Sequence, residues 1–272
     1  MHSAGWIDVD GEEIYLEISG EGPAVVCVHT AGQSGVQYRE VLEELPALGY
    51  RVIVPDLPGH GRSAPASTGP INDLHRYAEV CWGLVDALHL ERPFVVGCSI
   101  GGKITLDLCA HHGDEISGGV AMEADAYNGR LSVAGLCRSA QDPASPSQGD
   151  RTYFGTLASL GVDVDAVRAE RSARMHRRED NVVTTNDLIG WTTHDLRDVL
   201  GSTTCPVLLV AGADDFWIDP QWARASAAMM PLGEYRELAG VGHYPMEEID
   251  GFSRLLADWL EGLAQRDPRR GS

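Results

Sequence analysis

The fold is decided by one stretch of sequence, Pro93-Phe94-Val95-Val96-Gly97-Cys98-Ser99-Ile100-Gly101-Gly102, and by the run from Lys103 to His111 that follows it. The apolar start is typical of a buried strand, and the later run has the spacing of a helix. The turn between them fits the pattern G-x-S-x-G, in which the glycines relieve crowding and the serine hydroxyl stands free above a sheet. The pattern is weak alone and specific in this setting, so we predict that Ser99 is a nucleophile.

Four further apolar runs on either side of this stretch predict buried strands. They are Ala24–Val28, Arg51–Pro55, Gly118–Met122 and Pro206–Val210. Helical spacing separates some of them, from about Tyr38 to Leu48 and from about Leu74 to Leu88. Strands of this kind that alternate with helices predict an α/β fold with a doubly wound, mainly parallel sheet, whose ligand site lies at the carboxyl ends of the strands.

The strand rhythm disappears between residues 125 and 202. This segment shows polar loops such as Pro143–Pro146 and helical spacing around Val164 to Arg178. Its length of about 75 residues is far beyond that of an ordinary connection between two strands. We therefore predict a core made of residues 1–124 and 203–272, with a helical cap, residues 125–202, inserted into it.

A serine hydroxyl becomes a good nucleophile only when a base takes its proton, and that base needs an acid to hold it. His243 is the candidate base, because it follows a predicted strand, Tyr235–Leu238, in a glycine-containing loop. His29 ends a strand and is expected to shape the loop that follows it, and His194 is a candidate to face the substrate from the cap. The remaining candidates are expected on loops or helix surfaces: His60, His75, His89, His111 and His112.

The order of these motifs along the chain is itself informative. The loop after Val28, the segment Asp56–Ser63, the Ser99 turn, Gly212-Ala213-Asp214-Asp215 and Val241-Gly242-His243 follow one another. In this order they resemble the α/β-hydrolase family over nearly the whole chain. The resemblance implies the α/β-hydrolase fold with an inserted cap, and a catalytic triad in the order serine, acid, histidine.

Two carboxylates at predicted strand ends are candidates for the triad acid. Asp215 lies three residues after Gly212, at the position that resembles the family's usual acid, and Asp214 would then shape the loop. Glu123 ends the strand after the nucleophile helix, where a minority of α/β-hydrolases, lactone hydrolases among them, take their acid. We expect Asp215 to be the acid and keep Glu123 as the alternative.

The oxyanion of an acyl-transfer intermediate needs preorganised donors, which backbone amides supply. Ile100 N–H, at the start of the nucleophile helix, is expected to provide one. The resemblance implies that Ala31 N–H provides the second. Thr30 replaces the glycine usual in that loop, so its hydroxyl becomes a candidate contact to the substrate. Among the aromatic residues, Trp191 and Trp217 are the candidates for substrate binding, while Tyr127, Tyr153, Phe154 and Phe216 are equally well explained by packing.

These residues predict hydrolysis of a small-molecule carboxylic ester or lactone through an acyl-enzyme on Ser99. Alternatives on the same machinery are hydrolysis of a C–C bond and a cofactor-free perhydrolase reaction. A non-catalytic, ligand-binding protein of the same fold is the alternative from another class. Haloalkane dehalogenase and epoxide hydrolase chemistry are set aside, because both need a carboxylate nucleophile at the turn.

The composition of the chain excludes some classes of binding partner and cofactor. The 21 Lys and Arg against 40 Asp and Glu give a net charge of -19, which repels nucleic acid and anionic membranes. The six cysteines include no CxxC pair, so neither zinc nor a disulfide framework is indicated, and the proposed chemistry calls for no metal or organic cofactor. With no resemblance to a signal peptide, a cytoplasmic location is the default expectation. A homodimer is left open.

Overall fold

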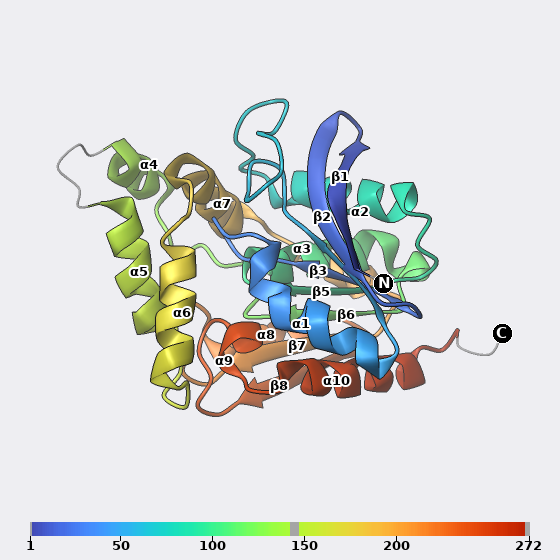
Figure 1. Cartoon of the computed structure of the whole chain (residues 1–272). Helices are drawn as coiled ribbons and strands as arrows, with labels where there is room; N and C mark the ends of the chain where they lie inside the picture. The colour runs from blue at the N-terminus through green and yellow to red at the C-terminus, as the bar shows by residue number, and fades with distance from the viewer. Residues whose placement is uncertain (1, 142–146, 270–272) are drawn as a thin grey trace.

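A mainly parallel sheet of eight strands forms the centre of the described residues, 2–141 and 147–269, in this computed structural model (Figure 1). Its strands are β1 (His2–Val9), β2 (Glu12–Ser19), β3 (Ala24–Val28), β4 (Arg51–Pro55), β5 (Phe94–Cys98), β6 (Gly118–Met122), β7 (Val207–Gly212) and β8 (Gly233–Leu238). In space they follow the order β1-β2-β4-β3-β5-β6-β7-β8. The pairs from β4 to β8 are parallel, and β1 and β2 extend the sheet in antiparallel fashion. The predicted fold class is confirmed.

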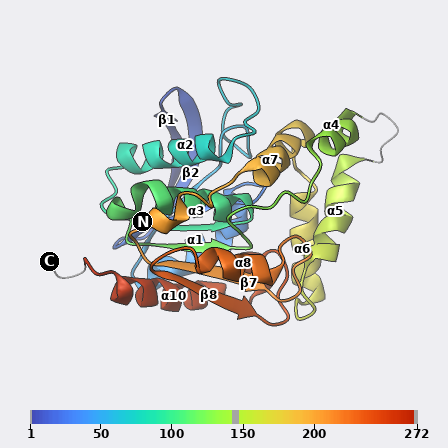
Figure 2. The same cartoon turned by 180° about the vertical axis from the view of Figure 1, so that it is seen from behind.

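Both faces of the sheet are covered, which explains why its central strands are apolar throughout. Along β3, Val26 and Val28 pack into one core, with residues of α2 (Leu74–Ala87), α3 (Ile100–His112) and α8 (Pro220–Ala227). Val25 and Cys27 point the other way, into a second core with α1 (Arg39–Glu44) and α10 (Phe252–Arg266). Figure 2 shows the two helical layers from behind. Every β3 side chain is therefore removed from water.

The helix predicted from about Tyr38 to Leu48 is broken into three short pieces. They are the 3-10 turn η1 (Gly35–Tyr38), the helix α1 and a second 3-10 turn, η2 (Leu45–Leu48). Pro46 lies inside η2, and proline lacks the N–H that a continuing α-helix would need. Pro46 therefore explains why the α-helix ends there.

The described residues between β6 and β7 form four α-helices, and we call this part of the chain the α4–α7 segment. They are α4 (Val133–Gln141), α5 (Gln148–Ser159), α6 (Ala166–His176) and α7 (Asn181–Thr193). Figure 1 shows α4, α5 and α6 grouped at the end of the molecule away from the C-terminus. The predicted loop Pro143–Pro146 lies outside the described residues. The expected helical character is present, and the predicted boundaries of a separate cap stay a prediction.

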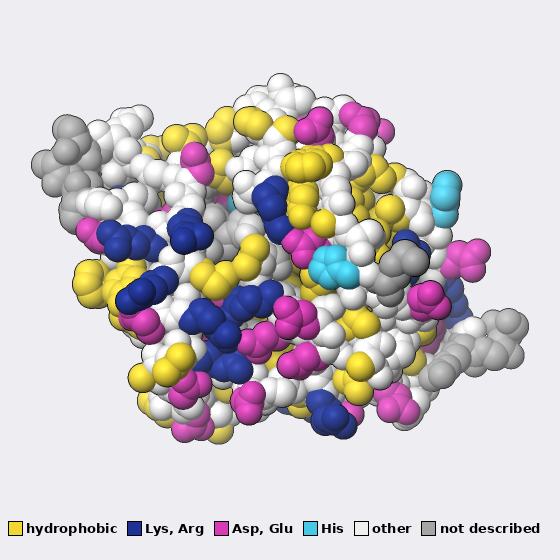
Figure 3. Space-filling view, in the orientation of Figure 1, with side chains coloured by type: hydrophobic (Ala, Val, Ile, Leu, Met, Phe, Trp, Pro, Cys, Tyr) yellow, Lys and Arg dark blue, Asp and Glu magenta, His cyan; other side chains and the backbone are white. Residues whose placement is uncertain are grey.

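Ion pairs fasten α6 to the core. Arg168 and Arg171 both reach Glu40, with N···O distances of 2.8 and 2.5 Å, and Arg168 also lies 3.4 Å from Asp250. Figure 3 shows basic side chains gathered on this side of the molecule, with acidic ones beside them. The local basic character differs from the strongly negative charge of the whole chain.

The remaining helical pieces are η3 (Gly113–Glu115), η4 (Leu200–Ser202) and α9 (Pro245–Glu248). Within the ranges that the structure describes, no helix is both long and apolar enough to cross a membrane. The parallel strands bring their carboxyl ends to one edge of the sheet. Ser99, Glu123, Asp215 and His243 follow β5, β6, β7 and β8, and so meet at that edge.

Candidate active site

Ser99 occupies a strained turn between β5 and α3. Its backbone angles are φ 58° and ψ -116°, a conformation that a non-glycine residue rarely adopts. The turn is held because the Ser99 N–H donates to Met122 O at 3.0 Å, and because two glycines permit close backbone approach. A Cβ atom on Gly97 would lie 2.0 Å from Gly101 O, and one on Gly101 would lie 2.2 Å from Val28 O. The glycines of the predicted pattern are therefore sterically required.

His243 is held against Asp215. The ring Nδ1 lies 2.8 and 3.0 Å from the two carboxylate oxygens, and Asp215 Oδ1 also accepts from Trp217 N–H at 2.6 Å. Burial acts to raise the pKa of Asp215, but the nearby His243 and these hydrogen bonds outweigh it and lower that pKa. An ionised Asp215 fixes the Nδ1–H tautomer, which leaves Nε2 of His243 as the basic nitrogen.

Glu248 secures the loop that carries His243. Its carboxylate accepts from the N–H groups of Gly242, Tyr244 and Gly161, each at 2.8 Å. Gly161 belongs to the α4–α7 segment, and the His243 N–H donates to Ser159 O of the same segment at 2.8 Å. The backbone on both sides of His243 is thus fixed by hydrogen bonds, and His243 and Ser99 line the same cavity.

Glu123, the alternative acid, lies behind Asp215. Its Oε1 accepts from Gly212 N–H at 2.7 Å, while Asp215 and not Glu123 bonds the His243 ring. Burial, and then the negative charge of Asp215, raise the pKa of Glu123 well above its usual range. The geometry therefore favours Asp215 as the partner of His243.

The two predicted oxyanion donors, Ala31 in the loop after β3 and Ile100 at the start of α3, lie at the carboxyl edge of the sheet. Ala31 and Ser99 line the same cavity, and Ile100 begins α3 directly after Ser99. No acceptor for the N–H of Ala31 or of Ile100 is found within residues 2–141 and 147–269. Thr30 lines the cavity, but its hydroxyl donates to Gln37 Oε1 at 3.0 Å. That hydroxyl supports the loop, and the predicted contact of Thr30 to a substrate stays a prediction.

Asp187, from α7, fastens this loop to the α4–α7 segment. Its buried carboxylate accepts from Gly32 N–H at 2.8 Å, from His60 Nε2 at 2.8 Å and from Tyr77 Oη at 3.0 Å. Gly32 has φ +67°, and a Cβ there would lie 2.1 Å from Thr184 Oγ1 of α7. The close approach of α7 to the loop therefore depends on a glycine.

His60 supplies the positive charge beside Asp187. Its Nδ1 lies 3.1 Å from Pro58 O and its Nε2 bonds Asp187, so both nitrogens donate, as in an imidazolium. Burial favours the neutral ring, but the charge and hydrogen bond of Asp187 outweigh burial and raise the pKa of His60. His60 lies in a loop, as predicted, but it is buried and not at the surface.

A second buried pair supports the same loop from the other side. His176 Nε2, from α6, donates to Glu247 Oε2 at 2.6 Å. Gln37 Nε2 donates to the same oxygen at 3.0 Å, while Gln37 Oε1 accepts from Thr30 N–H at 2.9 Å. Burial acts to raise the pKa of Glu247, but His176, Arg39 and Gln37 lower it to about 2. A hydrogen-bonded path thus joins α6 to the backbone beside Ala31.

These supports were missed by reasoning from the sequence, since they join residues far apart in the chain: His60 and Asp187 are 127 positions apart, and His176 and Glu247 are 71 apart. The one local signal was the His60 side chain in a glycine-rich loop. His194 was predicted as a candidate to face the substrate, and this is wrong. Its Nε2 lies 3.2 Å from Asp107 Oδ2, and it is absent from the cavity lining within the described ranges.

The cavity above Ser99 has a volume of about 290 Å³. It is lined by Ser99 and His243, by both predicted tryptophans, Trp191 and Trp217, and by side chains of α4, α5 and α7. Polar groups, Arg151 and Glu179 among them, stand among the apolar ones. The segment between β6 and β7 therefore provides much of the wall.

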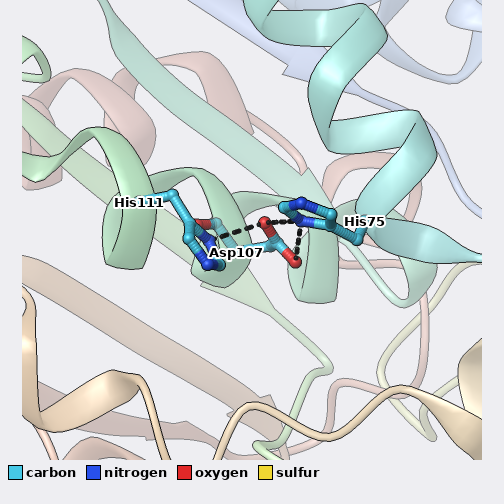
Figure 4. Close-up of side chains that lie close together, drawn as sticks. All are labelled: His75, Asp107 and His111. Atoms are coloured by element: carbon cyan, nitrogen blue, oxygen red, sulfur yellow. Dashed lines mark hydrogen bonds and ion pairs between the residues drawn. The ribbon is translucent and has the colours of Figure 1, made fainter.

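Two groups of described residues bring three potential metal ligands within 4.8 Å of one another. One is Glu123, Asp215 and His243, whose donor atoms already serve the contacts above. The other is His75, Asp107 and His111, which contribute nothing to the described lining of the cavity (Figure 4). Only the second group is free of the site around Ser99.

Comparison with known proteins identifies the family of the chain. A model of the alpha/beta hydrolase family matches residues 25–255. The magnesium-chelatase 30 kDa subunit of Rhodobacter capsulatus is 30% identical over 253 residues, which cover 89% of this chain and 88% of that protein. The 2-hydroxy-6-oxo-6-phenylhexa-2,4-dienoate hydrolase of Burkholderia cepacia is 25% identical over 270 residues, or 91% of each chain. The solved enol-lactonase of Burkholderia xenovorans LB400 has the same fold, with a TM-score of 0.81 at 22% identity over 94% of this chain and 100% of that one. The chain belongs to the α/β-hydrolase family.

Proposed function

We propose that this α/β-hydrolase cleaves a carboxylic ester or lactone through an acyl-enzyme on Ser99. The observation that carries the proposal is that His243, held at Nδ1 by Asp215, lines the same cavity as the strained Ser99. An imidazole oriented by an ionised carboxylate, in the same cavity as a serine hydroxyl, is the arrangement that activates a hydroxyl for acyl transfer.

The reaction proceeds in two steps. Ser99 Oγ attacks the substrate carbonyl while His243 Nε2 takes its proton, and the oxyanion accepts hydrogen bonds from Ala31 and Ile100 N–H. The tetrahedral intermediate collapses, and the alcohol leaves with the proton from His243. Water, deprotonated by His243, then attacks the acyl-enzyme and releases the acid. With a lactone, alcohol and acid remain joined in one product, and neither step calls for a cofactor.

The α4–α7 segment acts as the cap in this proposal. Trp191 and Trp217 would bind the apolar part of the substrate, since both line the cavity. Residues 125–202 would therefore set substrate choice, while the loops at the sheet edge carry out the chemistry. Support comes from the enol-lactonase of the same fold, whose likeness extends over nearly the whole chain.

Hydrolysis of a C–C bond on the same triad is the second candidate, favoured by the similarity to the dienoate hydrolase of Burkholderia cepacia. Both reactions would use Ser99 and His243, so the identity of these residues does not separate the two reactions. The two differ in the bond that must be broken, and a substrate panel therefore decides between them.

The test is turnover of a panel of p-nitrophenyl esters, lactones and a vinylogous β-diketone, with fluorophosphonate labelling. The proposal expects ester or lactone hydrolysis by the wild type, loss of both turnover and labelling in Ser99→Ala, and a large loss in Asp215→Asn. Turnover that survives in Ser99→Ala would overturn the serine mechanism. Cleavage of the diketone alone would establish the second candidate. A folded wild type that neither labels nor turns over any compound would point to ligand binding.

A further inference from the structure

Three imidazoles surround one buried carboxylate outside the active site. Figure 4 shows His75, from α2, and Asp107 and His111, from α3, with their side chains turned toward one another. Asp107 Oδ1 lies 2.9 Å from His75 Nδ1 and 3.0 Å from His111 Nδ1. On the other side, His194 Nε2 lies 3.2 Å from Asp107 Oδ2. One carboxylate thus gathers side chains from α2, α3 and the end of α7.

The donor atoms have the character and spacing of a zinc site. Neutral imidazole nitrogens and a carboxylate oxygen are ordinary ligands for Zn²⁺, at about 2.0–2.2 Å from the ion. Tetrahedral coordination at that distance separates neighbouring donors by about 3.3 Å. The two contacts to Asp107 Oδ1 are shorter than this by a few tenths of an ångström, and the third donor pair is within 4.8 Å. Small side-chain rotations would therefore open the group around an ion.

The ligands can be reached from solvent, although the carboxylate is fixed. The His75 and His111 side chains are 47% and 40% exposed, whereas that of Asp107 is 2% exposed. An ion bound to the two imidazoles would keep room for water as a fourth ligand. Asp107 and His111 are four residues apart on one helix face, the spacing that lets two ligands chelate the same ion.

The surroundings favour a cation at this place. His194 occupies the second oxygen of Asp107 and would orient the carboxylate, in the way that outer partners orient metal ligands. Asp73 and Glu79 add negative potential at His75. Hydrogen bonds hold the group together, including a 3.0 Å contact of His111 Nδ1 to Asp107 O.

We propose that His75, Asp107 and His111 bind one Zn²⁺ ion, with water as the fourth ligand and His194 supporting Asp107. The ion takes the Nδ1 lone pairs, so any protons on these nitrogens pass to solvent. It ties α2 to α3, the helix that begins after Ser99, and its role is to stabilise the fold. The site is independent of the proposed reaction.

Calorimetric titration of untagged, chelator-treated protein with Zn²⁺ tests the proposal, together with thermal unfolding. We expect one site per chain and a rise in Tm with Zn²⁺. His75→Ala and His111→Ala should each weaken binding at least tenfold and remove most of the rise in Tm. Because both side chains are well exposed, these variants should fold. His194→Asn should weaken binding about 10–100-fold, as expected when an outer partner is lost.

His89→Asn is the matched control, since His89 is exposed, lies elsewhere and has a positive φ of 50° that asparagine tolerates. It should bind Zn²⁺ like the wild type. Equal affinity in the wild type, His75→Ala and His111→Ala would place any bound zinc elsewhere and overturn the proposal. If the wild type binds no Zn²⁺ at about 100 micromolar, the proposal is wrong and the group is a hydrogen-bonded network only.

Discussion

Glu123 and Asp215 lie against each other behind His243, with a carboxyl oxygen of each and a ring nitrogen of His243 all within 4.8 Å. Two buried carboxyl groups this close do not both ionise readily, since like charges repel strongly where water is excluded. Their surroundings divide the roles. Asp215 faces the imidazole and stays charged, whereas the pKa of Glu123 is raised by burial and then by Asp215.

This division predicts how the two acids respond to amide substitution. Glu123→Gln keeps an acceptor for Gly212 N–H and nearly the same side-chain size, so we expect kcat within about threefold of wild type. Asp215→Asn should lower kcat by about 10⁴-fold, because the wrong His243 tautomer is favoured. Steady-state kinetics on a cleaved substrate measures both. The reverse ranking, with Glu123→Gln the more damaging, would make Glu123 the acid.

Glu123→Ala serves as the companion variant. It removes the acceptor of Gly212 N–H and leaves a buried donor unpaired, which costs about 1–3 kcal/mol of unfolding free energy. Urea unfolding separates this structural loss from the catalytic one. If the Glu123→Ala protein is as stable as the Glu123→Gln protein, the hydrogen bond to Gly212 N–H contributes nothing to stability.

Asp187 is expected to act on catalysis from a distance. Asp187→Asn weakens the bond to Gly32 N–H and leaves His60 without its charged partner, so the loop that presents Ala31 should shift. We expect a decrease in kcat of roughly 10²-fold, as when one oxyanion donor is lost, with a smaller change in KM. Asn186→Ala is the control, because Asn186 is a neighbour on α7 whose side chain, among the described residues, bonds only Val182 O. An unchanged kcat in a folded Asp187→Asn protein would show that the loop does not need this support.

Trp191 offers a specific test of substrate binding. Trp191 lines the cavity, and its indole N–H is buried with no acceptor among the described residues. A bound substrate oxygen would satisfy it. Trp191→Phe should therefore raise KM about tenfold, the value of a hydrogen bond near 1.4 kcal/mol, with little change in kcat. The exposed Trp222→Phe should leave KM unchanged. If both variants behave like wild type, Trp191 only packs.

His29 makes stability depend on pH in a defined window. Its Nδ1 bonds Thr30 O and its Nε2 accepts from Leu57 N–H, so the folded state holds a neutral ring. Burial, and then the charge of His60, lower its pKa to about 4. Between pH 6.5 and 4 the unfolded chain therefore binds a proton that the folded protein does not, and stability falls as the pH falls.

The unfolding free energy is expected to fall by up to about 3 kcal/mol across that window. Each unit of difference between the folded and unfolded pKa of His29 contributes about 1.4 kcal/mol. Urea unfolding from pH 7 to pH 4 measures it, and His29→Gln should flatten the dependence. The exposed His2→Ala should retain it. Glu247, whose pKa is lowered from 4.5 to about 2, contributes mainly below pH 4.5, so its effect overlaps only the acid end of the window. An equal slope in His29→Gln and wild type would assign the dependence to other groups.

The part of this site that could be predicted from the sequence is the part written in local patterns. An apolar strand, a glycine-flanked turn and a helix together indicate Ser99, and strand ends indicate the positions of Asp215 and His243. Parallel strands bring such ends together whatever lies between them. Even the broken helix near Pro46 carried its own signal in the proline.

The rest depends on contacts between distant segments. Asp215 and Glu123 both follow neighbouring strands, so the pattern of strands does not show which carboxylate bonds the His243 ring. Gly32 and Asp187 are 155 positions apart, and α7 has no pattern that marks its carboxylate as buried. His194 looked accessible to the substrate because only the fold shows that Asp107 attracts its ring.

The bonds from Asp187 and from the His176–Glu247 pair also limit how this enzyme can be redesigned or can diverge. Replacing residues 125–202 with the corresponding region of a relative would exchange the pocket wall, the usual route to a new substrate. The same exchange would withdraw the supports of the Ala31 loop, so we expect a chimera that keeps Ser99, Asp215 and His243 to turn over slowly. Transplants that carry an aspartate and a histidine at these two places should retain turnover.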